Sequence, residues 1–379
     1  MVKKSDGSYR VCSDFRKLNR ITVFDAEPIP TAADIFSKLS ECQYFSKFDL
    51  CKGYWQIKIK EEDKEFTSFT CHKGLFQYNV MPFGLVNAPA TFNRMMRRLL
   101  QNEQTLSSYF DDVLSHTGSW DTHMTSLQEF FTRIRNAHLT LKPSKCSLGY
   151  DSISFLGYEL GKGCLKPLPS TVDKILRAPR PTTKTQLRSF LGLIGYYRSF
   201  VPNFALMALP LTDLTKKGLP NVLEWTDAQE QAFNSLRQYL VNPPILRLPD
   251  YKKQFILQTD AASGGIGAIL LQEEEGCRYP IAFASRKLLP RECNYATIEK
   301  ECLAVVWGIQ KFQTYLYGSQ FILETDHQPL QYLQQNNFQN SRLTRRSLSL
   351  QPYRFTLRYI KGSLNVGADF LSRNYAIDP

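Results

Sequence analysis

Carboxylates stand at the ends of two apolar, strand-like segments in the first third of the sequence. Asp49 ends one segment, and Asp111 and Asp112 follow the aromatic pair Tyr109 and Phe110 in the other. Three carboxylates packed against hydrophobic strands would repel one another unless a cation lies between them. Two Mg²⁺ ions about 4 Å apart could fill that role and promote in-line phosphoryl transfer. The pattern indicates a two-metal site, although an aromatic–aromatic–Asp–Asp run alone is more often an exposed turn.

Four further acids are spread over the last third of the chain. Asp260 and Asp326 each end an apolar strand, Glu301 lies in a helical segment, and Asp369 lies near the C-terminus. Acids at C-terminal strand ends and on an adjoining helix can meet at one edge of a sheet, where they could bind two Mg²⁺ ions and hydrolyse a phosphodiester. Each acid alone is more often a helix cap or a surface charge. Glu299 is an alternative to Glu301, because residues two apart on a helix point about 200° apart.

Composition narrows the class of protein. The 379 residues include 47 Lys and Arg against 35 Asp and Glu, a net charge of +12, which favours a polyanionic partner such as nucleic acid. The nine cysteines contain no Cys-x-x-Cys pair and form no zinc-type cluster with histidine, as expected of reduced thiols in an intracellular, cytoplasmic protein. Neither a signal peptide nor an apolar run of about 20 residues is present, so we set aside secreted and membrane classes.

Local patterns predict the elements that position the first group of acids. Residues 2–11 read as a hairpin with an Asp-Gly turn, and the alternation over 54–60 predicts a half-buried strand. A helix is expected to begin at Asn87. A tight hairpin over 108–114 carries the Asp-Asp pair near its turn, and Asp121 is the expected cap of the next helix.

Two breaks divide the chain into three predicted parts. Residues 161–184 are rich in Gly, Pro and Lys, and prolines recur over 243–249. After the second break, an α/β domain of about 130 residues is expected. Its predicted strands are 254–259, 265–272, 279–285, 319–325 and 355–360, with helices over 297–317 and 366–372. The predicted domains are 1–160, 161–249 and 250–379, in a multidomain fold that mixes α/β and α+β parts.

Several long motifs resemble the reverse transcriptase of gypsy-type long-terminal-repeat retrotransposons in order and spacing. They are FDLCKGYWQ at 48–56, MPFGLVNAPATF at 81–92, YFDD at 109–112, FLGY at 155–158 and FLGLIGYYR at 190–198. The four later acids, with SRKL at 285–288 and DHQPL at 326–330, resemble the ribonuclease H domain of the same elements. The resemblance runs from residue 2 to about residue 373. It implies a right-hand polymerase with partial fingers, palm, and thumb or connection, followed by a ribonuclease H-like α/β domain.

The resemblance implies roles for matching residues in the polymerase half. Asp49, Asp111 and Asp112 match the metal ligands of the palm. Tyr54 matches an aromatic steric gate, whose ring would clash with a ribose 2′-hydroxyl; the alternative is an ordinary strand aromatic. Phe83 stands where retroviral enzymes carry a Gln that contacts the incoming nucleotide, so its contact here would be packing.

Two further sets of residues are implied to contact substrate. Lys3 and Arg10 align with fingers residues that contact triphosphate, a task suited to the Lys point charge and the bidentate Arg, although Lys3 could equally be a solvated hairpin charge. The primer grip is implied at Leu156, Gly157 and Tyr158; the alternative is a simple buried strand.

In the C-terminal domain the implied metal ligands are Asp260, Glu301, Asp326 and Asp369. The resemblance implies two Mg²⁺ ions at each site, with Mn²⁺ as a substitute. The implied partners are an RNA template, a DNA primer, RNA–DNA hybrid and deoxyribonucleoside triphosphates, without a membrane and with dimerisation left open, inside a retrotransposon particle. The expected activity is RNA-directed DNA synthesis with ribonuclease H cleavage. Because relatives carry more fingers residues before Val2, the alternative is a truncated relic that only binds nucleic acid or retains only hybrid cleavage.

Overall fold

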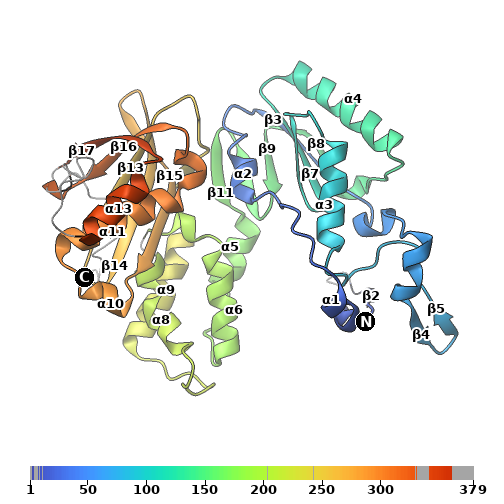
Figure 1. Ribbon diagram of the computed structural model, residues 1–379, viewed down its shortest axis with the longest axis horizontal. Helices are drawn as coiled ribbons and strands as arrows, with labels where there is room; N and C mark the ends of the chain where they lie inside the picture. Colours follow the sequence, from blue (N-terminus) through green and yellow to red (C-terminus); the bar gives the residue numbers. More distant parts are fainter. Residues whose placement is uncertain are drawn as a thin grey trace. The chain divides into compact units, whose positions relative to one another are not determined.

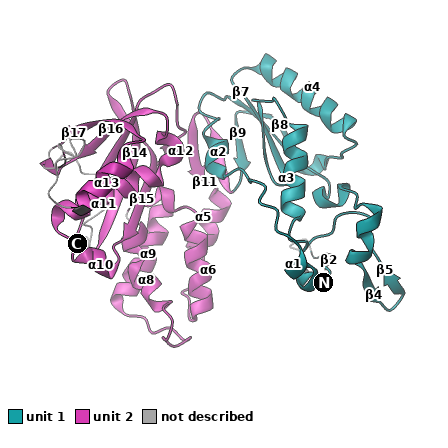
Figure 2. Cartoon of the chain, in the orientation of Figure 1, with its two compact units in different colours: residues 1–156 teal, residues 157–379 magenta. Residues whose placement is uncertain are grey.

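The structure is a computed structural model of the chain, which forms two compact units. Figure 2 colours these units, residues 1–156 and 157–379. The described residues are 2–3, 7, 9–10, 12–202, 204–241, 243–328, 330 and 341–360. Asp369 and the helix predicted over 366–372 lie outside the described residues. All nine cysteines are free thiols, as expected.

A four-stranded antiparallel sheet organises the first unit (Figure 1). Its spatial order is β6 (Leu106–Tyr109), β7 (Asp112–Thr117), β3 (Tyr44–Asp49) and β8 (Ser147–Tyr150). Two helices pack on this sheet, α3 (Ala88–Leu99) and α4 (Trp120–Asn136). Their buried side chains, Phe92 and Met96 of α3 and Phe130 of α4, join Phe48 and Val113 of the sheet in one core. This core holds the ends of β3 and β7, where the first acids lie.

Smaller elements complete the first unit. The predicted opening hairpin is present as β1 and β2, and the hairpin over 108–114 is present as the β6–β7 turn. The remaining elements are β1 (Val2–Lys3), β2 (Tyr9–Arg10), α1 (Arg16–Ile21), α2 (Ala32–Phe36), β4 (Phe69–Cys71), β5 (Gly74–Phe76) and β9 (Ser152–Phe155).

Two local predictions in this unit are wrong. The strand predicted over 54–60 is instead a 3₁₀ helix, Gly53–Gln56, followed by an irregular stretch. The Gln56 side chain explains the difference, because its Nε2 donates to the carbonyls of Cys51 and Thr140 and holds the segment in a turn. Ser119, not Asp121, caps α4, since its hydroxyl accepts the backbone N–H of Thr122.

The second unit begins with a small antiparallel sheet of β10 (Tyr158–Gly161), β11 (Cys164–Pro167) and β12 (Leu246–Arg247). Helices lie between β11 and β12 in the sequence. They are α5 (Pro169–Leu176), α6 (Lys184–Gly195), α7 (Phe204–Met207), α8 (Leu209–Leu214) and α9 (Asp227–Val241). Thr183 caps α6, because its hydroxyl accepts the backbone N–H of Gln186.

A five-stranded sheet follows, in the spatial order β15 (Cys277–Lys287), β14 (Gly265–Glu274), β13 (Phe255–Ala261), β16 (Gln320–Thr325) and β17 (Arg354–Tyr359). The strands β13, β14 and β15 are antiparallel, whereas β13 and β16 run parallel, so their C-terminal ends lie side by side. Asp260 lies near the C-terminal end of β13, and Asp326 directly follows the C-terminal end of β16. The pairing therefore brings these distant acids together.

The long helix α11 (Thr297–Lys311) packs against β13 and β14. Gly308 permits the close approach, since a Cβ there would lie 3.1 Å from Thr259 Cγ2 and 3.2 Å from Ala268 Cβ. The other helices are α10 (Pro290–Cys293), α12 (Gln313–Leu316) and α13 (Ser341–Leu350). The helix predicted over 297–317 is thus broken at Phe312. Across the described residues, no helix combines the length and the apolarity needed to span a bilayer.

Candidate active sites

The first candidate site lies at one end of the β3–β7 ladder. Asp49 and Asp112 are direct partners across the two antiparallel strands. Asp111 lies in the turn between β6 and β7, where the preceding residue, Phe110, has a φ of 50°. The backbone carbonyl of Asp111 accepts the N–H of Leu50 at 3.4 Å. The fold thus places the three acids next to one another, although more than sixty positions separate the first from the others.

Two lysines balance the charge of these acids. Lys145 Nζ lies 2.9 Å from Asp49 Oδ2, and Lys47 Nζ lies 3.7 Å from Asp112 Oδ1. Burial raises the pKa of Asp112, against the lowering effect of Lys47, while the hydrogen bond to Asp49 raises the pKa of Lys145. In the described part of the chain, the carboxylate oxygens of Asp49, Asp111 and Asp112 do not all lie within 4.8 Å of one another. The oxygen donors suit Mg²⁺, and Lys145 contacts Oδ2 of Asp49.

Gly53 and Tyr54 form the side of this site. A Cβ on Gly53 would lie 2.7 Å from Asp111 Oδ1 and 3.0 Å from Phe92 Cε2, so only glycine fits without a shift. The half-buried ring of Tyr54 lies 5.3 Å from the rings of both Phe83 and Phe92. Burial and the charge of Asp111 raise the pKa of Tyr54. Gly53 had no role among the residues predicted from the sequence, although its position directly before the aromatic pair Tyr54 and Trp55 was an available clue.

The segment predicted as a primer grip contains a tight turn. Leu156 and Gly157 both have positive φ, 46° and 73°, between β9 and β10. Tyr158 is buried at the start of β10 and donates its hydroxyl to the carbonyl of Tyr196. Tyr197 donates to the carbonyl of Gly157 at 2.6 Å. Tyr158 is therefore a core residue. The structure describes the backbone of Lys3, in β1, and of Arg10, in β2.

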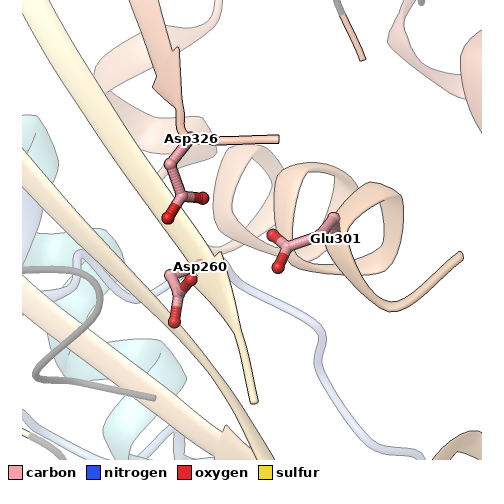
Figure 3. Close-up of side chains that lie close together, drawn as sticks. All are labelled: Asp260, Glu301 and Asp326. Carbon is pink, nitrogen blue, oxygen red and sulfur yellow. The ribbon is translucent and has the colours of Figure 1, made fainter. Parts of the chain in front are cut away.

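The second candidate site is a compact acidic cluster in the five-stranded sheet domain. Asp260, Glu301 and Asp326 each offer a carboxylate oxygen, and these atoms all lie within 4.8 Å of one another. Figure 3 shows Asp260 and Asp326 on neighbouring strands and Glu301 extending from α11. Asp260 is 1% exposed and Glu301 is 5% exposed. Buried carboxylates this close need a proton or a cation between them, and the all-oxygen donor set fits Mg²⁺ or Mn²⁺.

The structure distinguishes Glu301 from its alternative, Glu299. One oxygen of Glu299 accepts the N–H of Ala296 at 3.1 Å, which caps α11, and the other accepts Arg342 Nη1 of α13 at 3.0 Å. Glu299 therefore fixes the start of the helix and its neighbour, while Glu301 joins the acidic cluster. The sequence could not separate the two, because the partner Arg342 is distant along the chain.

His327 is a residue of this site that the sequence analysis quoted in a motif without giving it a role. It directly follows Asp326, and its Nδ1 is buried without a hydrogen-bond partner among the described residues. Burial lowers the pKa of His327, against the raising effect of Asp326. Its backbone N–H donates to Thr325 Oγ1 at 3.2 Å. Its adjacency to an acid at a strand end was the clue that could have identified it.

Comparison with known families assigns both units. Residues 2–160 match the family described as reverse transcriptase (RNA-dependent DNA polymerase). Residues 250–353 match the RNase H-like domain found in reverse transcriptase. Residues 2–160 therefore form a reverse transcriptase domain, and residues 250–353 form an RNase H-like domain. The resemblance inferred from the sequence motifs is therefore confirmed.

Curated relatives of this chain are retrotransposon polyproteins. The Pol polyprotein from transposon 297 of Drosophila melanogaster is 42% identical over 98% of this chain and 35% of its own length. That from transposon 412 of the same fly is 37% identical over 96% of this chain and 30% of its own length. The transposon Tf2-3 polyprotein of Schizosaccharomyces pombe is 32% identical, over 98% and 28%. The chain thus spans about a third of the length of these relatives.

Solved structures of foamy viral protease-reverse transcriptase share the fold. A complex with double-stranded DNA has a TM-score of 0.85 at 25% identity, over 95% of this chain and 76% of the other. A dRH form with double-stranded DNA has a TM-score of 0.86 at 25% identity, over 95% and 64%. These matches confirm the predicted fold class, in which a reverse transcriptase domain of mixed helices and sheets precedes an RNase H-like domain.

Proposed function

We propose that this chain is an RNA-directed DNA polymerase that also cleaves the RNA strand of RNA–DNA hybrids. The observation that carries the proposal is that each family-matched domain places acids at strand ends. They are Asp49, Asp111 and Asp112 in one domain and Asp260, Glu301 and Asp326 in the other. Two divalent ions bound at each site would activate the attacking oxygen and stabilise the leaving oxygen.

In the polymerase domain the chain's own residues would orient the substrate. Asp49, Asp111 and Asp112 would hold the ions once Lys145 releases Asp49. Tyr54, supported by Phe83 at 5.3 Å, would lie under the sugar and exclude a 2′-hydroxyl. Lys3 and Arg10 would contact the triphosphate through charge and bidentate hydrogen bonds.

In the RNase H-like domain, Asp260, Glu301 and Asp326 would hold the ions beside the scissile phosphate of the RNA strand. We propose Asp369, which lies outside the described residues, as the fourth ligand on the motif resemblance alone. The buried positions of Asp260 and Glu301 limit water around the ligands, which strengthens their interaction with a cation.

The proposed partners are an RNA template, a DNA primer, hybrid duplex and deoxyribonucleoside triphosphates. The net charge of +12 favours binding to a phosphate backbone. Relatives in the comparison include a foamy viral enzyme solved in complex with RNA/DNA hybrid. We place the primer grip at the turn of Leu156 and Gly157 with the adjoining Tyr158, and keep the division at 1–160, 161–249 and 250–379. An intracellular retrotransposon particle stays the expected location.

The test assays both activities on one preparation of the full chain with Mg²⁺. Asp111→Asn should abolish primer extension on an RNA template and spare hybrid cleavage, and Asp260→Asn should do the reverse. The exposed acids Asp121 and Asp227 provide matched controls, since their Asn variants should retain both activities. Loss of both activities in a folded Asp111→Asn or Asp260→Asn variant would contradict two separate sites.

A second candidate function is hybrid cleavage without DNA synthesis. Asp260, Glu301 and Asp326 form a compact set within 4.8 Å, whereas Asp49 and Asp112 of the polymerase domain are each paired with a lysine. Retained cleavage with no extension in either Mg²⁺ or Mn²⁺ would favour this alternative. Nucleic-acid binding with neither activity would instead favour an inactive relic.

A further inference from the structure

An ionic cluster forms around a buried carboxylate in the five-stranded sheet, two residues before the acids Asp260 and Asp326. The side chain of Glu324, on β16, is fully buried. Its Oε2 accepts Gln258 Nε2 at 2.8 Å and Arg278 Nη1 at 2.9 Å, and its Oε1 accepts Arg278 Nη2 at 3.1 Å. Arg358 of β17 lies 3.5 Å from the same Oε1. One carboxylate thus gathers donors from three other strands.

The cluster joins the two strands that carry the acids of the site. Gln258 and Glu324 are direct partners in the parallel register of β13 and β16. Each stands two residues before an acid, Gln258 before Asp260 and Glu324 before Asp326. Their side-chain hydrogen bond therefore fixes the spacing of β13 and β16 immediately before Asp260 and Asp326.

The chemistry of the cluster makes that spacing rigid. A buried carboxylate is tolerated only while its partners keep good hydrogen-bond geometry, and a bidentate guanidinium adds directional constraint. An apolar pair at the same positions would fill the volume without fixing an angle or a distance. Groups that orient metal ligands in this way commonly change metal affinity when they are removed.

We infer that Gln258, Arg278 and Glu324, here called the Glu324 clasp, set the distance between Asp260 and Asp326 and thereby the affinity of this site for divalent metal. The three are positioning residues, since Gln258 and Arg278 both donate to Glu324, and Asp260 and Asp326 lie two residues further along the strands. The inference rests on the proposed metal-dependent function of the site.

The experiment measures Mn²⁺ binding by electron paramagnetic resonance of the free ion. The full chain carries Asp49→Asn, Asp111→Asn and Asp112→Asn, which removes the three polymerase carboxylates and leaves the RNase H-like site to report. Glu324→Gln and Gln258→Leu are compared in this background. Glu292→Gln is the matched control, because Glu292 is also buried and bidentate with an arginine, Arg286, at 2.7 and 3.1 Å, but lies in α10.

We expect Glu324→Gln to weaken Mn²⁺ binding by at least about tenfold, Gln258→Leu to weaken it less, and Glu292→Gln to leave it within about twofold. The midpoint of thermal unfolding in EDTA should fall in both Glu324→Gln and Glu292→Gln. A loss of Mn²⁺ affinity in Glu324→Gln alone is then an effect on the position of the ligands and not on stability. Unchanged Mn²⁺ affinity in folded Glu324→Gln would overturn the inference. If Glu324→Gln does not fold, Gln258→Leu decides, and unchanged affinity there overturns it.

Failure of the proposed function has a different outcome. Asp260→Asn in the same background should release the bound Mn²⁺. If the background protein binds no Mn²⁺ that Asp260→Asn removes, the metal site itself is absent, and the proposed function and the clasp are both overturned.

Discussion

Lys145 donates from Nζ to Asp49 Oδ2 across 2.9 Å, linking the segment Pro143–Lys145 to the end of β3. The charges of Asp49, Asp112 and Asp111 all raise the pKa of Lys145, so the ammonium is the counter-charge of the polymerase acids. The lysine side chain is 56% exposed, and it can move into solvent at small cost. A metal ion at Asp49 therefore competes with a cation that the chain itself supplies.

Lys145→Met should tighten Mn²⁺ binding at the polymerase acids by about two- to fivefold, the worth of a partly exposed ion pair. The measurement is a Mn²⁺ titration in a chain whose other site is blocked by Asp260→Asn. Lys142→Met is the control, because Lys142 is exposed nearby and makes no ion pair in the described part of the chain. Equal effects of the two variants would show that only general charge matters.

Tyr54→Val should admit ribonucleotides, because removing the ring opens room for the 2′-hydroxyl. The ratio of ribonucleotide to deoxyribonucleotide incorporation efficiency should rise by about tenfold or more. Tyr44→Val is a suitable control, since Tyr44 lies at the opposite end of β3 from Asp49 and packs against Trp120. An unchanged ratio in Tyr54→Val would leave the ring with a packing role alone.

Gly53→Ala should reduce primer extension by about tenfold or more, because the added Cβ would press on Asp111 at 2.7 Å. Hybrid cleavage should not change. Gly192→Ala is the control: a Cβ there meets no atom within 4 Å, and alanine in the helix α6 should raise the thermal midpoint. Full extension activity in Gly53→Ala would mean that Asp111 can shift without loss of function.

His116 should make the first unit sensitive to acid. Its Nε2 lies 2.9 Å from Ser107 Oγ, and burial lowers its pKa from 6.5 to about 4. Between these values the unfolded chain binds the extra proton, so stability is full above pH 6.5 and falls as the pH drops toward 4, by up to about 3 kcal/mol.

Urea unfolding at several pH values between about 4 and 7.5, followed by circular dichroism, tests this prediction. His116→Gln should flatten the pH dependence relative to the unmodified chain. His72→Gln should not, because His72 is exposed. Parallel pH curves for the unmodified chain and His116→Gln would exclude the buried histidine as a cause.

The positions of Asp49, Asp260 and Asp326 at or near strand ends could be predicted from the sequence. Asp49, Asp260 and Asp326 each follow an apolar run, and the strands form where the pattern indicates. Side chains that act at a distance could not be predicted in the same way. The choice between Glu299 and Glu301 depends on Arg342, which reaches Glu299 from another helix.

Side-chain hydrogen bonds explain one wrong prediction and one residue whose burial the sequence did not indicate. The alternation over 54–60 looks like a strand, but Gln56 binds the carbonyls of Cys51 and Thr140 and the segment turns. The buried position of Glu324 was equally invisible, because a glutamate in an apolar strand gives no indication of the arginine that neutralises it. In each case the deciding partner is remote in the chain or competes with the backbone.

The parallel pairing of β13 with β16 also determines when the acidic cluster can form during synthesis of the chain. Between these strands the chain must form β14, β15 and α11, so Asp326 leaves the ribosome long after Asp260. Parallel neighbours need such a crossover, and non-local pairings form slowly. A nascent chain therefore has no assembled acidic cluster until the crossover is complete.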